Sequence, residues 1–321
     1  MLRSAKVKAL AKINLDLRVL AKRPDGFHEL RTVFQTISLA DSLDIDYEPA
    51  RRTELSLDGN VEIADNLVLR AAQAVLESMK THARVRFRLT KRIPMGGGLG
   101  GGSSDAAAVL LALPALAGKS AAIGEIAAGL GSDVPFFLEG GTALAIGRGT
   151  EFYSLPDIAE QPVLVASGGV HVSTAEAYRA LDRSLTFTGS SYRISGFQSF
   201  VRALGDLRRA DLASASSEND FEAVVFRRFP KLKTIREKLS EGGAVARMTG
   251  SGSAIFAIYA SERDRERARK SFHGERAVGQ CELLSARLVS RRSYQRMWRR
   301  QLAAHLAPES RIWPPPSRYA R

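Results

Sequence analysis

The sequence predicts an α+β protein with two domains, from three observations. The chain has 321 residues, roughly the length of two domains of ~150 residues each. Stretches in which apolar and polar residues alternate are mixed with stretches of helical spacing, without a long parallel strand–helix–strand series. The segment SLPDIAEQP at 154–162 has the composition of a boundary. We therefore expect an N-terminal domain over 1–155, a C-terminal domain over 156–286 and a basic tail over 287–321.

The first expected element is a β-strand. Apolar residues occupy every second position from Val7 to Val19 and alternate mostly with polar residues. A period of two places the apolar set on one face, so Lys12 and Asn14 share the opposite face. The RPDG sequence at 23–26 predicts a tight turn after this strand.

Helical and strand patterns then follow one another. Helical spacing begins at Leu67, with Asp65 or Asn66 as the N-cap. The alternation over 84–89 predicts a half-buried strand. The sequence SSDAAAVLLAL predicts a second helix, which Pro114 should end or kink.

The second half contains a similar mixture. PVLVAS at 162–167 reads as a strand, and the capping-box spacing from Ser173 to Glu176 predicts a helix that starts there. The apolar positions within 232–239 predict another helix. Strands are expected at 244–248 and 254–260, on either side of the sequence TGSGS.

The composition is that of an ordinary globular protein, with 45% apolar and 25% charged residues. Cys281 is the only cysteine, which excludes an internal disulfide and a cysteine-based zinc site. No apolar run approaches the ~20 residues of a membrane span, and the N-terminal MLRSAKVKAL lacks the apolar core of a secretory signal. We expect a cytoplasmic protein without a membrane partner.

The net charge of +13 is concentrated in the tail. Residues 287–321 contain nine arginines and a single acid, Glu309, and so hold +8 of that charge. Such a segment is typical either of binding to a polyanion or of a solvated extension, and we expect the second. Gln295 to Leu306 has the pattern of an amphipathic helix, and the terminal WPPPSRYAR is expected to be extended or disordered.

The glycine-rich segment PMGGGLGGGSSDAA at 94–107 is the strongest chemical signal. Gly96–Gly102 has glycine at six of seven positions and runs directly into the predicted helix. Glycines let the backbone approach a ligand closely, and a helix N-terminus attracts anions, so this segment predicts a phosphate site. A Walker A loop is excluded because no lysine follows the glycines. Ser103 and Ser104 are placed to cap the helix or to bind a metal held by phosphates.

These residues resemble the GHMP kinases, whose signature P-x-x-x-G-L-G-S/G-S-S-A/D-A is matched from Pro94 to Ala106. AKINLDLRVLAKRPDGFHEL, NLVLRAA, GSDVPFFL and RMTGSGSAIFA extend the match over about four-fifths of the chain. They resemble the branch that phosphorylates 4-diphosphocytidyl-2-C-methyl-D-erythritol in non-mevalonate isoprenoid synthesis. The resemblance implies an N-terminal domain like domain 2 of ribosomal protein S5 and a ferredoxin-like C-terminal domain. It also implies ATP and Mg²⁺ as cofactors and transfer of the γ-phosphate to the acceptor's 2-hydroxyl.

The resemblance assigns catalysis to two residues. Asp133, in GSDVPFF, matches the residue that deprotonates or positions the acceptor hydroxyl, and Lys12 matches its partner, which keeps the carboxylate ionised. Without the resemblance, Asp133 would read as a turn aspartate and Lys12 as a solvated strand lysine.

The remaining site residues also come from the resemblance. Phe27 and Tyr178 match an aromatic clamp on cytosine, with His28 at the edge of the base. The full substrate set is Asn14, Phe27, His28, Asp133, Thr174, Tyr178, Thr249, Gly250 and Ser251. The nucleotide set is Asn66, Lys91, Pro94, Met95, Gly96, Gly97, Gly98, Leu99, Gly100, Gly101, Gly102, Ser103 and Ser104. Asn66 would otherwise be an N-cap and Lys91 a surface charge, and no metal ligand is assigned.

Two alternatives remain open from the sequence. The first is a GHMP kinase for another alcohol, such as homoserine or mevalonate, although those acceptors carry no base to stack. The second is a nucleic-acid-binding protein on a degenerate kinase scaffold, supported only by the arginines of the tail. We expect a small cytidyl diphosphate substrate, no nucleic acid on the folded body, and a monomer or weak homodimer.

Overall fold

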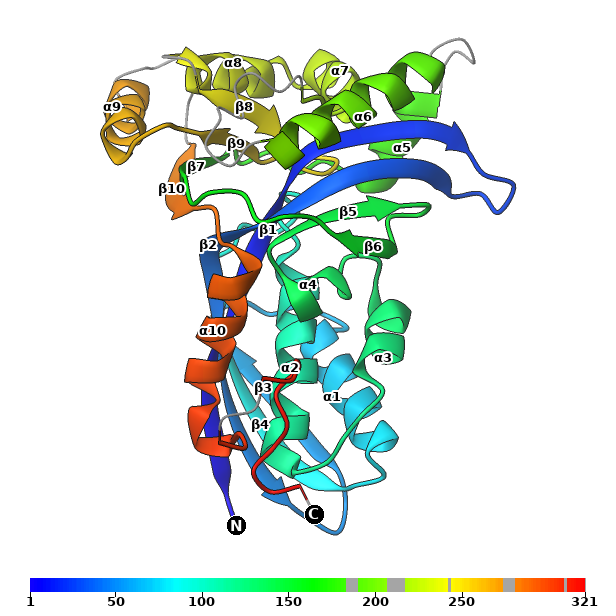
Figure 1. Ribbon diagram of the computed structural model, residues 1–321, viewed down its shortest axis with the longest axis vertical. Coiled ribbons are helices and arrows are strands. Elements are labelled where there is room, and N and C mark those ends of the chain that lie inside the picture. The colour runs from blue at the N-terminus through cyan, green and yellow to red at the C-terminus, as the bar shows by residue number, and fades with distance from the viewer. Residues whose placement is uncertain (183–189, 207–216, 242–243, 274–280, 309–310, 321) are drawn as a thin grey trace.

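Two β-sheets organise the molecule (Figure 1). The computed structural model describes residues 1–182, 190–206, 217–241, 244–273, 281–308 and 311–320. Within this part, one six-stranded sheet has the order β3-β4-β2-β5-β6 with β1 paired to β2, and a four-stranded sheet has the order β10-β7-β9-β8. The second order is that of a ferredoxin-like sheet, and the predicted α+β fold is confirmed.

The elements follow one another as alternating groups of strands and helices. The first sheet and its helices comprise β1 (Arg3–Lys22), β2 (His28–Pro49), β3 (Glu54–Gly59), α1 (Leu67–Ser78), β4 (Ala83–Thr90), α2 (Gly101–Ala117), α3 (Ile123–Leu130), α4 (Phe136–Glu139), β5 (Thr142–Ile146) and β6 (Glu151–Ser154). The rest comprises β7 (Pro162–Ser167), α5 (Thr174–Asp182), α6 (Ser190–Asp206), α7 (Phe221–Arg228), α8 (Pro230–Leu239), β8 (Val245–Met248), β9 (Ile255–Ile258), α9 (Glu262–His273), β10 (Glu282–Arg287) and α10 (Arg291–Gln301). No helix in these described ranges is both long and apolar enough to cross a bilayer.

Strand β1 connects the two halves of the molecule. It runs from the six-stranded sheet to the underside of α6 (Figure 1). Leu17 also forms an isolated β-bridge with Asn219. From Ala9 to Leu20 its polar face is therefore buried as well as its apolar face. Arg18 and Asp16, both at most 1% exposed, form an ion pair with Nε 2.9 Å from Oδ1. Since Glu218 also donates its backbone N–H to Asp16, this pair fastens β1 to the second half.

Helix α2 differs from its prediction at both ends. It begins at Gly101 with Gly100 as a left-handed N-cap and no capping side chain. Capping by Ser103 or Ser104 is therefore wrong: the Ser104 hydroxyl donates to the carbonyl of Leu10 on β1. The helix also continues through Pro114 to Ala117, with Gly118 as its C-cap, so the expected end at the proline is wrong.

The tail packs on the first sheet, where we expected a solvated extension. Helix α10 begins at Arg291, is N-capped by Ser290 and lies beside the first sheet (Figure 1). Tyr294, Trp298 and Leu302 are at most 2% exposed and belong to the apolar core of that sheet. The amphipathic pattern of Gln295 to Leu306 is therefore confirmed as a helix, but the expected solvated extension is wrong, because the apolar face of that helix packs on the core.

Candidate active site

The glycine-rich segment forms the loop between β4 and α2. Gly96, Gly98 and Gly100 have φ values of +67°, +75° and +71°, in the left-handed region that glycine enters at little cost. The loop is anchored on two sides. The N–H of Lys12 on β1 donates to the carbonyl of Leu99 at 3.0 Å, and the N–H of Ala254 donates to that of Gly97 at 3.2 Å.

The turn between β8 and β9 packs directly on this loop. A Cβ atom on Gly98 would lie 2.2 Å from the carbonyl oxygen of Thr249, and the Thr249 hydroxyl donates to the Gly98 carbonyl at 3.1 Å. Gly250 has its Cα close to Gly98 as well. The TGSGS sequence is therefore more than a hairpin turn, because it fixes the shape of the loop from the second sheet.

Lys12 and Asp133 meet beside the loop. Lys12 Nζ lies 3.4 Å from Asp133 Oδ2, and the two side chains are 4% and 28% exposed. Burial lowers the pKa of Lys12, and the charge and hydrogen bond of Asp133 partly offset that effect. A solvated strand lysine, the alternative for Lys12, is excluded. The arrangement offers a partly open carboxylate beside a buried cation.

Asn14 connects this pair to the second half of the molecule. Its side-chain oxygen accepts from Lys12 Nζ at 2.8 Å, from the Thr249 hydroxyl at 3.1 Å and from the Gly250 N–H at 3.0 Å. Its amide nitrogen donates to the Thr32 hydroxyl. Asn14 thus uses both polar atoms on protein partners, which makes it a spacer between Lys12 and the β8–β9 turn.

His28 and Tyr178 form a stacked pair at the end of β2 and on α5. Their ring centroids are 4.4 Å apart with an interplanar angle of 26°. Burial, and secondarily the charge of Asp133, raise the pKa of Tyr178 to about 12, so the aromatic pair lies within the electrostatic reach of Asp133. His28 Nε2 lies 2.6 Å from Asp182 Oδ1. The sequence analysis did not single out Asp182, which has no local motif.

Phe27 lies at the surface next to this pair. Its side chain is 54% exposed, and the Arg148 guanidinium lies 4.2 Å from its ring centroid. In the described part of the chain, Phe27 and Tyr178 make no ring contact with each other. The two rings predicted to clamp a base therefore have separate partners, an arginine and a histidine.

Lys91 is buried, so the surface-charge alternative is wrong. Its Nζ lies 2.5 Å from Asp41 Oδ2 and 2.7 Å from Asp105 Oδ2. Asp41 also accepts the backbone N–H groups of Arg92 and Ile93. This cluster fixes the chain where β4 enters the glycine loop. Neither carboxylate was predicted, because Asp41 is remote in sequence and an aspartate in the first turn of a helix, such as Asp105, is favourable there without any partner.

Asn66 lies at a groove beside β3, β4 and α1. The groove has a volume of about 800 Å³ and is lined by residues that include Leu57, Ile63, Asn66 and Leu89. Asn66 accepts the N–H of Val68 and so also caps α1. Asn60 pairs with the backbone of Lys91 through both of its side-chain polar atoms. The groove is therefore continuous with the segment that leads into the loop.

Other predicted residues lie around the loop without forming a single cluster. Met95 is 60% exposed, and the Thr174 hydroxyl lies 2.8 Å from that of Ser251. His171 lies against Gly96: a Cβ atom there would be 3.1 Å from the histidine Nδ1. In the part of the chain that the structure describes, no group of three or more His, Cys, Asp or Glu side chains could hold a metal ion.

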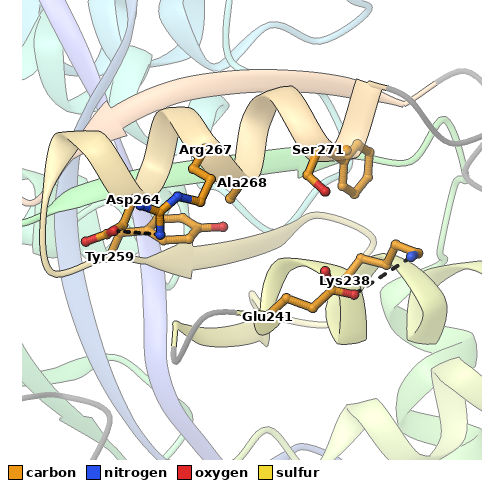
Figure 2. A pocket seen from close by; sticks show the side chains of 8 residues that line it. Lys238, Glu241, Tyr259, Asp264, Arg267, Ala268 and Ser271 are labelled. Carbon is orange, nitrogen blue, oxygen red and sulfur yellow. Dashed lines mark ion pairs between the residues drawn. The ribbon is translucent and has the colours of Figure 1, made fainter.

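A separate pocket lies between α8 and α9 (Figure 2). It has a volume of about 250 Å³ and contains none of the predicted site residues. Its charged side chains are paired with one another: Lys238 lies 3.8 Å from Glu241 and Arg267 lies 3.5 Å from Asp264. This pocket has no connection to the Lys12–Asp133 pair, and we assign it no role.

Two family models match the chain. They are described as the GHMP kinases N terminal domain, over residues 66–141, and GHMP kinases C terminal, over residues 199–276. The first contains the glycine loop and Asp133.

Relatives of known name are similar over most of their length. A 4-diphosphocytidyl-2-C-methyl-D-erythritol kinase from Solibacter usitatus is 51% identical over 99% of this chain and 98% of its own. The enzyme of the same name from Pelotomaculum thermopropionicum is 42% identical over 82% of this chain and 90% of its own.

Solved structures have the same fold. A 4-(cytidine 5'-diphospho)-2C-methyl-D-erythritol kinase matches with a TM-score of 0.73 and 35% identity, over 88% of this chain and 98% of its own. A homoserine kinase from Cytophaga hutchinsonii matches with a TM-score of 0.72 at 18% identity, over 88% and 94%. At that identity the second match shows the fold alone.

Proposed function

The chain belongs to the GHMP kinase family and is an ATP-dependent kinase of small molecules, and we propose that its acceptor is 4-diphosphocytidyl-2-C-methyl-D-erythritol. The reaction moves the γ-phosphate of ATP to the 2-hydroxyl of the methylerythritol unit and leaves ADP. The observation that carries the proposal is the Lys12–Asp133 pair beside the glycine loop, in a chain half identical to a kinase of that name.

Asp133 is proposed to receive or orient the acceptor hydroxyl. Phosphoryl transfer needs mainly positioning and charge neutralisation, and Asp133 offers a carboxylate that is partly open to solvent. Lys12, held by Asn14 at 2.8 Å, is proposed to place a positive charge beside that carboxylate, where negative charge develops in the transition state.

The nucleotide is proposed to lie along the loop, with its base in the groove beside Asn66. The left-handed glycines and the N-terminus of α2 direct backbone N–H groups and a partial positive charge at the phosphates. Mg²⁺ generally keeps waters and phosphate oxygens and needs few protein ligands. Ser103, in the first turn of α2, would offer a hydroxyl oxygen to such an ion, which would neutralise phosphate charge.

The cytosine is proposed to bind at Phe27, His28 and Tyr178. Phe27 offers an exposed ring on which a base can stack, and base–aromatic stacking is worth ~1–3 kcal/mol. His28 and Tyr178 lie close enough to Asp133 for its charge to act on the tyrosine. The ribose and the diphosphate, which separate the base from the methylerythritol unit, would then extend from this aromatic pair towards Asp133. We further propose a cytoplasmic monomer or weak homodimer with no nucleic-acid or membrane partner.

The test is ADP release with Mg-ATP and each of three acceptors: 4-diphosphocytidyl-2-C-methyl-D-erythritol, homoserine and mevalonate. We expect turnover of the cytidyl acceptor alone. Asp133→Ala should lower kcat by a factor of about 100 or more, the scale of positioned acid–base catalysis, while a fluorescent ATP analogue still binds.

Two results would contradict the proposal. Turnover of homoserine or mevalonate in place of the cytidyl acceptor would remove the substrate assignment and leave the kinase family intact. A near-normal rate for Asp133→Ala would remove the catalytic assignment. A matched control is Glu125→Ala, which removes an exposed carboxylate from α3.

A further inference from the structure

Helix α4 is a single turn that the tail holds in place. Phe136–Glu139 begins three residues after Asp133 and has no side-chain N-cap. An isolated turn of helix is unstable by itself, and the carbonyl groups at its C-terminal end lack helical partners. The position of Asp133 therefore depends on what holds this turn.

Donors from the tail satisfy three consecutive residues of α4. The Tyr294 hydroxyl donates to the carbonyl of Phe137 at 2.5 Å. Trp313 Nε1 donates to the carbonyl of Leu138 at 2.9 Å, and Gln295 Nε2 donates to the carboxylate of Glu139 at 3.2 Å. Tyr294 is 1% exposed, and burial raises its pKa, so its hydroxyl remains a neutral donor.

The two residues that follow α4 are glycines, and the tail packs directly against both of them. Gly140 and Gly141 have φ values of +67° and +77°. A Cβ atom on Gly140 would lie 2.5 Å from the ring of Tyr294, and one on Gly141 would lie 2.6 Å from Arg291 Cβ. These two glycines let α10 approach the end of α4 to within contact distance.

Phe137 connects α4 to the glycine loop and to Lys12. A Cβ atom on Gly100 would lie 2.8 Å from the ring of Phe137 and 3.1 Å from Lys12 Cγ. The Phe137 ring and the Lys12 stem are thus both packed against the N-cap of α2. A shift of α4 would move Asp133, the glycine loop and Lys12 relative to one another.

We propose that Tyr294 is a positioning residue for phosphoryl transfer, acting through the Phe137 carbonyl on Asp133 and the glycine loop. The inference rests on the proposed function, because it takes Asp133 to be the group that meets the acceptor. Tyr294 touches no substrate in this account. Its effect is on the distance between Asp133 and the phosphate, so it should alter kcat more than the KM for ATP.

The test compares Tyr294→Phe with Ser317→Ala. Each variant removes one tail hydroxyl from a backbone carbonyl: Tyr294 bonds to Phe137 on α4, whereas Ser317 donates to Ala115 on α2 at 2.6 Å. Both should lose similar stability in urea. Tyr294→Phe should lower kcat about fivefold, the rate equivalent of one buried hydrogen bond, with the KM for ATP unchanged. Ser317→Ala should keep the wild-type kcat.

Equal kcat values for the two variants, measured well below their unfolding temperatures, would overturn the positioning role while leaving the proposed function intact. If the wild-type enzyme does not turn over the cytidyl acceptor, the proposed function fails, and amide hydrogen exchange decides the positioning. Residues 133–139 should then exchange faster in Tyr294→Phe than in Ser317→Ala. Identical exchange would overturn the inference without any activity measurement.

Discussion

Lys91 shows how one buried side chain can shape a site that it does not enter. Its ammonium group lies between Asp41 and Asp105, which are 1% and 2% exposed. Two carboxylates share one cation, and Asp105 Oδ1 has no hydrogen-bond partner in the described part of the chain. Burial, together with the charge of Asp41, outweighs the effect of Lys91 and raises the pKa of Asp105 to about 7. The cluster therefore fixes the segment that leads into the glycine loop. It does so by burying charged groups, which is unfavourable by itself.

This cluster makes folding stability depend on pH. The unfolded Asp105 titrates near 3.8 and the folded group near 7, so the native state binds the extra proton between these values. Its contribution to the free energy of unfolding is present below about pH 4 and is lost as the pH rises through 7. Asp105→Asn cannot bind this proton, so its free energy of unfolding should not show this decrease. Relative to wild type, the variant should therefore become more stable as the pH rises from about 4 to about 7. The slope should be at most about 1.4 kcal/mol per pH unit.

Urea unfolding of both proteins at pH 5, 6, 7 and 8 measures that difference. Glu125→Gln, which removes an exposed carboxylate on α3, is the control and should run parallel to wild type. A constant difference between Asp105→Asn and wild type across the four values would contradict the assignment of the proton to Asp105.

At the scale of elements, the glycine loop and the β8–β9 turn act as one unit. The loop supplies the left-handed backbone at Gly98, and Thr249 fills the space that a side chain there would need. Neither segment can change shape alone, since the N–H of Ala254 is bonded to the loop at Gly97. The loop is therefore shaped by both sheets.

Gly98→Ala tests this coupling. The new methyl group would meet the Thr249 carbonyl at 2.2 Å with φ at +75°, so we expect a loss of more than about 2 kcal/mol in the free energy of unfolding. Gly124→Ala is the matched control, because a Cβ atom there meets nothing within 4 Å. Within α3 this second change should stabilise the protein by about 0.5–1 kcal/mol. Chemical denaturation measures the free energy of unfolding of both variants. Equal stabilities would contradict the coupling, because they would show that the loop can change shape without the β8–β9 turn.

Local patterns predicted part of the fold but not β2, α6, α9 or β10, and long-range contacts explain several of the errors at the site. The alternation in β1, the glycine loop and the helix that starts near Ser173 are each encoded by neighbouring residues. Ser104 was misassigned because its partner is Leu10, on another strand. The surface-charge alternative for Lys91 failed because Asp41, on another strand, pairs with it. The Lys12–Asp133 pairing came from the resemblance, since no local pattern joins residues so far apart.

At the scale of the whole molecule, the tail is part of the first sheet's core. The two sides of α10 differ. Tyr294 and Trp298 are buried on one side. On the other side, exposed arginines recur every four residues, at Arg292, Arg296 and Arg300. Arg291, by contrast, attaches the tail to the rest of the protein, since its guanidinium group donates to the carbonyls of Leu155 and Thr142. The high charge of the tail is thus compatible with a structural role.

The contributions of packing and charge in the tail can be separated by two variants of α10. Trp298→Ala leaves a cavity at a side chain that is 1% exposed and should lower the free energy of unfolding by about 3–5 kcal/mol. Replacement of Arg292, Arg296 and Arg300 by glutamine removes three positive charges and should change it by less than about 0.5 kcal/mol per site, with kinase turnover retained. Thermal and urea unfolding with an ADP-release assay measure both. A tail that acts through its charge would give the reverse order, with the triple variant impaired and Trp298→Ala close to wild type. We expect the first order, because the contacts that attach α10 to β1 and α4 are made by its apolar face.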